Sequence, residues 1–363
     1  MALTSVIARL FAAFAAAGLA SVLVSAPALS QAFEVSGVEI DATANTAFEA
    51  QSRALTDGQV RAAERLVRRL TLPEDRAEAD LPPMTSETAA GLIAGLQISD
   101  EQRSATRYRG VLAVTFDRRA VRDYFARFDV PFVESQAAPI LAVPVLEGET
   151  GARLGAGPWH RAWREGGFDT ALAPFIALGS RTTEDGAQLG LGRITAAQAL
   201  SLNESALSDL AETYGVDRVA VIIARRGGEA VRASGTLVTF TSDGARREAL
   251  PTVAARGGFA AAARRLVELR EEDWKRASVV RGGDAAELSL TLLFESITQW
   301  RALQRAVAGA SLVQDARLDA LSRSGAAMTI SHRGTRNQVS AELAARGARL
   351  EQDEELGWTV RPR

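Results

Sequence analysis

The sequence contains no cysteine and only two histidines, His160 and His332. The absence of cysteine excludes disulfides, thiolate nucleophiles and thiolate metal ligands, and it also excludes the lipid-attachment cysteine of a bacterial lipoprotein. Two histidines far apart in the chain disfavour a metal centre built from several imidazoles. The sequence therefore predicts no metal and no cofactor, and it identifies no catalytic residue.

Lysine is almost absent as well, because Lys275 is the only lysine in the chain. The phosphate-binding motif G-x-x-x-x-G-K-[ST] does not occur, and Gly151, Gly155 and Gly157 do not form G-x-G-x-x-G. We interpret these glycines as part of a flexible loop. The formal net charge of −2 provides no overall basic field, so the sequence predicts no nucleic-acid partner.

Long hydrophobic runs are lacking except near the N-terminus. Residues 10–24 are apolar and rich in alanine, but this run is shorter than the roughly 20 residues that span a bilayer. We interpret residues 1–32 as a secretory signal, with Ala26-Pro27-Ala28 and Ser30-Gln31-Ala32 as cleavage candidates. An uncleaved membrane anchor is the alternative. We expect an exported, periplasmic protein with no membrane span in the mature chain.

The length of 363 residues predicts two or three domains. The apolar patterns and turn residues favour an α+β or α/β fold with three small modules, residues 33–136, 137–276 and 277–363. The first module reads as β-α-α-β-α, with a long helix over residues 47–70. Arg61, Arg65 and Arg68 lie on one side of that helix, which we interpret as a solvated face rather than an anion site.

The second module is predicted to be an α/β domain with a mixed sheet. At its centre, residues 217–244 indicate a hairpin that turns at Gly227-Gly228. The third module reads as β-α-β-β-α-β, the order of a ferredoxin-like sandwich. That fold hosts many functions and carries none by itself. The third module shares its topology with an RNA-binding domain, but it lacks the glycine-aromatic strand motifs that stack bases.

Several short motifs resemble a family of exported proteobacterial proteins known as domain of unknown function 2066. They are Leu66-Val67-Arg68-Arg69-Leu70-Thr71, Val114-Thr115-Phe116-Asp117, Val130-Pro131 and Pro139-Ile140-Leu141-Ala142-Val143. The chain departs from the family pattern at Leu72, where a glycine is usual, and near Phe132, where a tryptophan is common. The resemblance implies a periplasmic location and no active site.

The middle module also resembles a second group of envelope proteins. Its order of strand, helices, Gly215-Val216-Asp217-Arg218-Val219-Ala220-Val221 and hairpin is similar to the N-terminal domain of the exported protein TolB. It is also similar to related modules in envelope lipoproteins that activate cell-wall synthases or assemble secretion pores. This resemblance implies contacts with other envelope proteins.

A few polar residues are candidates for chemistry, and each has a simpler interpretation. His160 is a conceivable general base, but no G-x-S-x-G motif accompanies it, so a surface or helix-start histidine is the simpler reading. His332, with Arg333 and Arg336, is a conceivable anion site at a helix start, or an ordinary loop. Two acidic clusters could supply a glycosidase pair but are more simply solvated charge: Glu184-Asp185 and Glu271-Glu272-Asp273. The tryptophans could stack on sugars but are more simply core residues: Trp159, Trp163, Trp274, Trp300 and Trp358.

The balance of these patterns predicts a non-catalytic protein that binds other components of the cell envelope in an adaptor, assembly or accessory role. We expect a protein partner, bound through arginine-bearing helix faces or a sheet edge. Two alternatives remain open: an envelope hydrolase that uses a carboxylate pair, and a sensor of a small ligand in the middle module.

Overall fold

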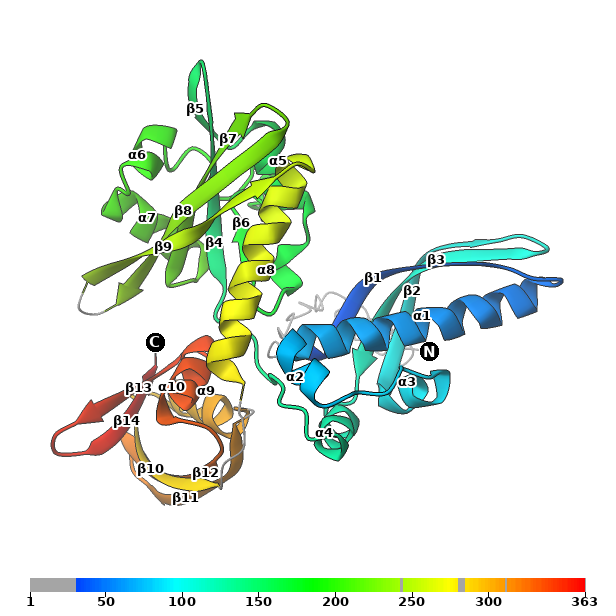
Figure 1. Cartoon of the computed structure of the whole chain (residues 1–363). Helices are drawn as coiled ribbons and strands as arrows, with labels where there is room; N and C mark the ends of the chain where they lie inside the picture. The colour runs from blue at the N-terminus through cyan, green and yellow to red at the C-terminus, as the bar shows by residue number, and fades with distance from the viewer. Residues whose placement is uncertain (1–30, 242–243, 280–284, 311, 363) are drawn as a thin grey trace, which may run out of the picture.

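The computed structural model describes residues 31–241, 244–279, 285–310 and 312–362. In this part the chain is a mixed α/β protein with three β-sheets and helices packed against them (Figure 1). The predicted signal segment lies outside the described residues except at its end, where a short 3-10 helix (Gln31–Phe33) begins the first unit. No helix in the described ranges is both long enough and apolar enough to cross a bilayer.

The N-terminal unit has a three-stranded antiparallel sheet of order β1-β3-β2. Its elements in chain order are β1 (Glu34–Thr43), α1 (Ala47–Leu70), α2 (Pro73–Glu78), α3 (Ser86–Leu92), β2 (Ile93–Arg103), β3 (Arg107–Phe116) and α4 (Arg118–Arg127). The predicted order β-α-α-β-α was wrong, because it extended α3 to Leu96 and omitted β2. Ala94 and Gly95 at the start of β2 have low β-propensity, which hid the strand.

Helix α1 covers one face of this sheet. Thr46 caps it by accepting a hydrogen bond from the backbone N–H of Glu49 (3.2 Å). Gly58 sits in the middle of the helix, where a side chain would be unfavourable for packing: a Cβ there would lie 2.5 Å from Ile40 and 2.6 Å from Leu112. The glycine therefore lets α1 lie directly on β1 and β3.

The middle unit has a mixed sheet of order β5-β4-β7-β8-β9, in which β6 also pairs with β4. Its elements are β4 (Ile140–Gly148), β5 (Gly151–Leu154), α5 (Gly157–Glu165), the 3-10 helix η3 (Phe168–Thr170), β6 (Phe175–Ala177), α6 (Ala196–Leu200), α7 (Glu204–Tyr214), β7 (Arg218–Gly227), β8 (Ala230–Thr241), β9 (Gly244–Ala255) and α8 (Gly258–Ser278). Helices α5 and α8 pack on one face, and α6 and α7 on the other. Strand β4 is buried on both faces, as this layered arrangement requires.

The predicted central hairpin is β7–β8, but its turn is shifted by one residue. Gly227 still pairs with Ala230, so the turn residues are Gly228 and Glu229. Gly228 has φ +62°, a left-handed conformation that glycine adopts without steric cost. The prediction omitted β5 and β9, and β9 extends the hairpin into a three-stranded meander.

The C-terminal unit has a five-stranded sheet of order β11-β12-β10-β14-β13. Its elements are β10 (Ala286–Leu293), α9 (Ile297–Ala308), β11 (Val313–Leu321), β12 (Gly325–His332), α10 (Arg336–Ala345), β13 (Ala348–Asp353) and β14 (Gly357–Pro362). Helices α9 and α10 pack against one face of the sheet.

The end of this unit differs from the predicted ferredoxin-like order, because the closing segment is a hairpin and not one strand. Asp353 accepts hydrogen bonds from the backbone N–H groups of Glu355 (2.9 Å) and Leu356 (3.0 Å), which makes a tight turn. Gly357 follows with φ +72°. As a result β14 returns parallel to β10 and β13 becomes the outer strand.

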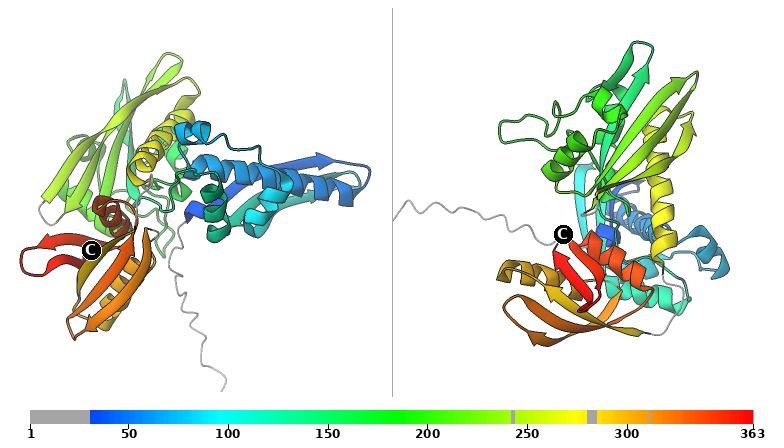
Figure 2. Two further views of the ribbon diagram at one scale, coloured as in Figure 1. Left: turned by 60° about the horizontal axis from the view of Figure 1, so that its bottom comes forward. Right: turned by 90° about the vertical axis from the view of Figure 1, so that its left-hand side faces the viewer.

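Helix α8 links the units. It packs along the middle sheet, and its C-terminal end lies beside both other units (Figures 1 and 2). Leu72, Val133 and Val279 form a small buried cluster there, with Trp274 of α8 packed against it. We call this place the junction.

Candidate functional site

The junction is organised by the linker between α4 and β4, residues 128–139. The backbone N–H of Val133 donates to the carbonyl of Leu70 at the end of α1 (2.9 Å). The next residue, Glu134, accepts hydrogen bonds from Arg122 of α4 (3.1 Å to Oε2) and lies 3.6 Å from the guanidinium of Arg333. This carboxylate therefore connects the N-terminal unit to the C-terminal unit.

The second half of the linker is bonded to the middle unit. The carbonyl of Ser135 accepts from the indole Nε1 of Trp274 on α8 (2.9 Å), and the backbone N–H of Ala137 donates to the carbonyl of Leu172 (2.8 Å). The N–H of Leu172 in turn donates to the carboxylate of Glu271 on α8 (2.6 Å). All three units therefore share hydrogen bonds with this one segment or with α8.

The only lysine of the chain lies in the junction. Lys275 is 9% exposed, and its Nζ donates to the carbonyl of Arg68 (2.9 Å) and more weakly to that of Thr71 (3.4 Å). These carbonyls end α1, where backbone acceptors lack helical partners and a cation is favoured. Burial lowers the pKa of Lys275, and Glu271 opposes this effect. The lysine thus caps a helix of another unit.

The predicted arginine face of α1 has a structural role that the sequence did not indicate. Four arginines of α1 reach back to carbonyl oxygens of the edge strand β1: Arg53 to Thr43, Arg61 to Glu39, Arg65 to Gly37 and Arg69 to Glu34, at 2.9–3.3 Å. Arg68, on another side of the helix, pairs with Glu64 at 3.7 Å. Arg61, Arg65 and Arg68 are exposed, which agrees with the predicted solvated face. Arg61 and Arg65 in addition occupy backbone acceptors along β1.

The opposite edge of the same sheet is open. Among the strands that the structure describes, β2 pairs only with β3, and the register shifts on both sides of the stretch 95–99. Asp100, in the second irregularity, has φ +51°, a left-handed conformation uncommon for aspartate outside turns and bulges. Leu96 and Ile98 lie on the helix-covered face of the sheet but beyond the helix, so they remain 39% and 38% exposed. We call residues 95–99 the β2 edge.

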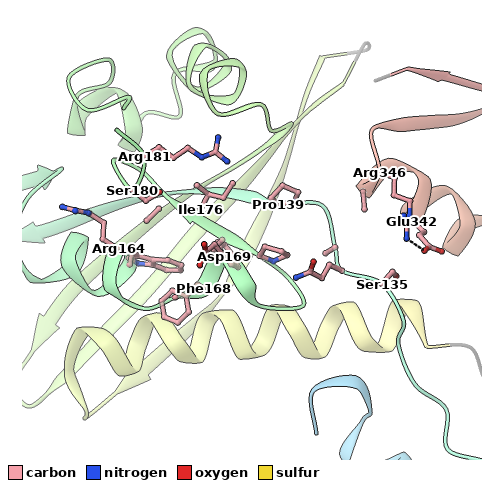
Figure 3. A pocket seen from close by; sticks show the side chains of 18 residues that line it. Ser135, Pro139, Arg164, Phe168, Asp169, Ile176, Ser180, Arg181, Glu342 and Arg346 are labelled. Carbon is pink, nitrogen blue, oxygen red and sulfur yellow. Dashed lines mark hydrogen bonds and ion pairs between the residues drawn. The ribbon is translucent and has the colours of Figure 1, made fainter. Parts of the chain in front are cut away.

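A cleft of about 550 Å³ lies between the middle unit and α10. Figure 3 shows Arg164, Ser180 and Arg181 on the side of the middle unit, and Glu342 and Arg346 on α10. The linker that carries Ser135 and Pro139 forms the wall between them. The volume is within the range of small-ligand sites. Of the candidates for chemistry that the sequence indicated, only Trp163 lines this cleft.

The cleft does not contain a converging pair of free acids. Glu342 is almost fully buried, and its carboxylate accepts from the N–H of Leu312 (3.0 Å) and pairs with Arg346 (3.5 Å). Asp169, the other acid of the lining, is exposed on η3. The described lining therefore lacks the two free acids facing one space that carboxylate hydrolysis requires.

One wall of the cleft holds a buried donor without an acceptor. The indole Nε1 of Trp163 has no hydrogen-bond partner in the described residues, and Trp163 is 2% exposed. By contrast, the indole of Trp159 donates to the carbonyl of Ile222 (3.0 Å). An unpaired buried N–H costs about 1–3 kcal/mol, and this one is enclosed by the protein rather than exposed to the cleft.

His160 is buried, not at the surface as one reading expected, although it does lie in the first turns of α5. The residue is 5% exposed, and neither ring nitrogen has a hydrogen-bond partner among the described residues. Burial lowers the pKa of the imidazole, and the charge of Arg164 lowers it further. A neutral histidine with no acceptor or nucleophile beside it does not form a general-base site.

This burial predicts a pH dependence of stability. Below the ordinary pKa of 6.5 the imidazole of the unfolded chain binds a proton more readily than that of the folded chain, so the free energy of unfolding should fall as pH falls through this window. We expect His160→Leu to flatten this fall and to stabilise the protein at pH 8 by about 1 kcal/mol, because two unpaired polar atoms are removed. Urea unfolding at pH 8.0, 6.5 and 5.5 measures both. An unchanged slope between pH 6.5 and 5.5 in the variant would contradict the assignment.

His332 ends β12 and is also buried, and its Nδ1 lies 3.3 Å from the carbonyl of Arg333. The two arginines that would form an anion site with it are already in use. Arg333 pairs with Glu134, and the guanidinium of Arg336 lies 5.4 Å from the ring centre of Trp358. The ordinary structural interpretation of this segment therefore fits the contacts better than the anion site.

The two acidic clusters have local partners. Asp185 accepts from the hydroxyl of Thr183, and this bond lowers the pKa of its carboxyl. On α8, Glu272 lies 3.8 Å from Arg276, while Glu271 holds the N–H of Leu172. No group of three or more histidine, aspartate or glutamate side chains is placed to hold a metal ion in the described ranges. The acids thus act as surface pairs or as junction contacts.

The tryptophans and glycines have packing and turn roles. Trp159, Trp163 and Trp300 are buried in cores, as the simpler interpretation predicted. Gly155 and Gly157, with φ +79° and +88°, form the turn between β5 and α5, and Gly151 begins β5 and does not lie in a loop. These glycines therefore shape a turn rather than a phosphate-binding loop.

Comparison with known proteins adds no assignment. No protein-family model matches this chain. No curated protein matches it at a significant level either.

Proposed function

We propose that this chain is a non-catalytic binding protein of the bacterial cell envelope, with an adaptor or assembly role, and that it binds an extended segment of a protein partner along the β2 edge. The observation that carries this proposal is an uncharged, apolar and unprotected strand edge at Gly95–Ser99, with Leu96 and Ile98 exposed on one face. An added strand would pair with the backbone of β2 and place alternate apolar side chains on these two residues.

The other edges in the described residues are protected by means that proteins use against unwanted strand pairing. β1 is occupied by the arginines of α1. β9 contains Pro251 and packs against α8. β5 is only four residues long. β6 is the exception: it is three residues long and borders the cleft beside α10. Charged side chains line the edges of the C-terminal sheet: Asp315, Arg317 and Asp319 on β11, and Arg349, Glu351 and Asp353 on β13.

This proposal includes three further expectations. The units built on the three sheets act as modules with limits near residues 33–136, 137–276 and 277–363. The chain is exported to the periplasm, which osmotic-shock fractionation tests, and it binds no nucleic acid. The resemblance of the short motifs to the family known as domain of unknown function 2066, and of the middle unit to the TolB N-terminal domain, would agree with such a role.

A carboxylate-pair hydrolase is the less supported alternative, because the acids of the cleft and of the two clusters are exposed singly or bound to local partners. A sensor of a small ligand has one favourable observation, the cleft beside α10.

The β2 edge can be tested by site-specific photo-cross-linking in cells. A photo-reactive residue at Gln97, which is exposed on the edge, should capture one partner through an extended segment with alternating apolar residues. We expect the double substitution Leu96→Lys and Ile98→Lys to reduce this capture at least about tenfold. A charged lysine side chain is costly to remove from water, and it opposes the pairing of an added strand.

The matched control is Leu318→Lys with Leu321→Lys. These leucines are also exposed, at 42% and 55%, on an edge strand of the C-terminal sheet. Capture at Gln97 should be unaffected by that change. If both double variants reduce capture equally, or if the captured segment is helical, the β2 edge is not the binding surface.

A further inference from the structure

The cleft beside α10 has the parts of an anion site with an apolar lining. Its lining includes the arginines Arg164, Arg181 and Arg346 and two acids. Of these charges, Arg346 is paired with Glu342. Arg164 and Arg181 have no carboxylate within ion-pair distance in the described part of the chain. The lining therefore carries two unpaired positive charges against one exposed acid, Asp169.

Arg181 is held in place without being neutralised. Its Nη1 donates to the carbonyl of Tyr214 (3.1 Å), and its guanidinium carbon lies 5.4 Å from the centre of the Tyr214 ring. The hydroxyl of Tyr214 is itself fixed between the N–H of Gly179 and the carbonyl of Leu189, at 2.7 Å each. A guanidinium positioned in this way keeps further donors for a planar oxyanion such as a carboxylate.

Next to Arg164 in the chain, Trp163 also lines the cleft. Phe168 and Ile176 add apolar surface to the same lining (Figure 3). The lining therefore provides cationic donors and an apolar surface. This set matches an oxyanion attached to an apolar body.

Strand β6 gives the cleft an open backbone edge. The carbonyl of Pro174 accepts from Ile140, and the N–H of Leu178 donates to Ala142, so alternate residues of this segment bond to β4. Because backbone groups alternate in direction along a strand, Phe175, which lies between them in the sequence, directs its N–H and carbonyl to the other side. Phe175 lines the cleft.

We propose that this cleft is a binding site for a carboxylate carried on an apolar body, and that the carrier is a short peptide with a free C-terminal carboxylate. Arg181 binds the carboxylate, Arg164 adds positive charge to the lining, and the outer edge of β6 pairs with the peptide backbone. This site is separate from the β2 edge, so failure of either proposal leaves the other standing.

Isothermal titration calorimetry of the full chain with three probes tests the site. The probes are the tripeptide N-acetyl-alanyl-valyl-phenylalanine, the same tripeptide as its C-terminal amide, and 3-phenylpropionate. The acid tripeptide should bind at least about tenfold more tightly than the amide, the difference expected for a charge-assisted hydrogen-bonded pair. Tighter binding of 3-phenylpropionate than of the tripeptide would overturn the peptide assignment. Equal binding of acid and amide, or no binding of any probe, would overturn the site.

Variants separate ligand binding from folding. Arg164→Gln and Arg181→Gln should each weaken the acid tripeptide about tenfold. Arg161→Gln, an exposed arginine on the same helix α5 but outside the lining, should leave it unchanged. Trp163→Phe should leave binding of the acid tripeptide nearly unchanged, because the indole N–H that it removes is enclosed by the protein and does not face the cleft. Full-strength binding by both glutamine variants would refute the role of the arginines.

Discussion

Replacing Lys275 with alanine should lower the free energy of unfolding by about 3 kcal/mol. The substitution removes the charged donor at the end of α1 and leaves a space where its buried stem packs. The contact joins α8 to a helix about two hundred residues earlier in the chain. We therefore also expect the N-terminal unit to unfold at lower urea concentration than the middle unit. Urea unfolding combined with limited proteolysis measures both effects.

Two controls isolate the contribution of the cap. Lys275→Met keeps most of the apolar stem and should recover part of the loss, so the difference between Met and Ala reports packing. Arg276→Ala changes the neighbouring residue, whose side chain is 54% exposed and forms long surface pairs. Such pairs are worth about 0–1 kcal/mol. If Lys275→Ala costs no more than Arg276→Ala, the capping interpretation is wrong.

Trp159→Ala should have a larger effect, about 3–5 kcal/mol. This residue is fully buried on α5 and packs edge-to-face on Trp163, with ring centres 5.6 Å apart. It also contacts the ring of Phe259 on α8 and donates its indole N–H to Ile222 of β7. Its removal therefore separates two helices and the sheet at once. Chemical denaturation followed by circular dichroism gives the change directly.

The conservative variant Trp159→Phe should cost less than half as much, since it keeps a ring and loses chiefly the hydrogen bond to Ile222. Because Trp163 lies against Trp159 and also lines the cleft, Trp159→Ala should weaken the acid tripeptide as well, whereas Trp159→Phe should not. A loss below about 1 kcal/mol in Trp159→Ala would show that α5 contributes little to the middle core.

The sequence patterns located most helices and strands, because their periodicity and caps are local features. α1 was predicted with its correct limits, since Thr46 and Pro73 border a run with helical spacing. β2 was missed because Ala94 and Gly95 resemble the preceding helix in composition. The alternation of Leu96 and Ile98 was the signal that could have identified it.

The sites were less accessible to prediction than the fold. The cleft is lined by Arg164 and Arg181 of the middle unit and by Arg346 of α10, and this lining depends on how α10 lies against the middle unit. The same is true of Lys275, whose partners are carbonyl oxygens of α1 that no side-chain pattern reveals. Long-range contacts to backbone atoms leave no periodic trace in a sequence.

The burial of the single lysine gives this protein a built-in chemical probe. In the folded chain the Lys275 amine is covered by the end of α1 and is shielded from an amine-directed reagent. Modification of Lys275 should therefore proceed at the rate at which the junction opens, or in proportion to its open population. A lysine-specific protease has one site in the whole sequence and would report the same event as a single cut. Mass spectrometry of one peptide thus follows the separation of α8 from α1 without any engineered label.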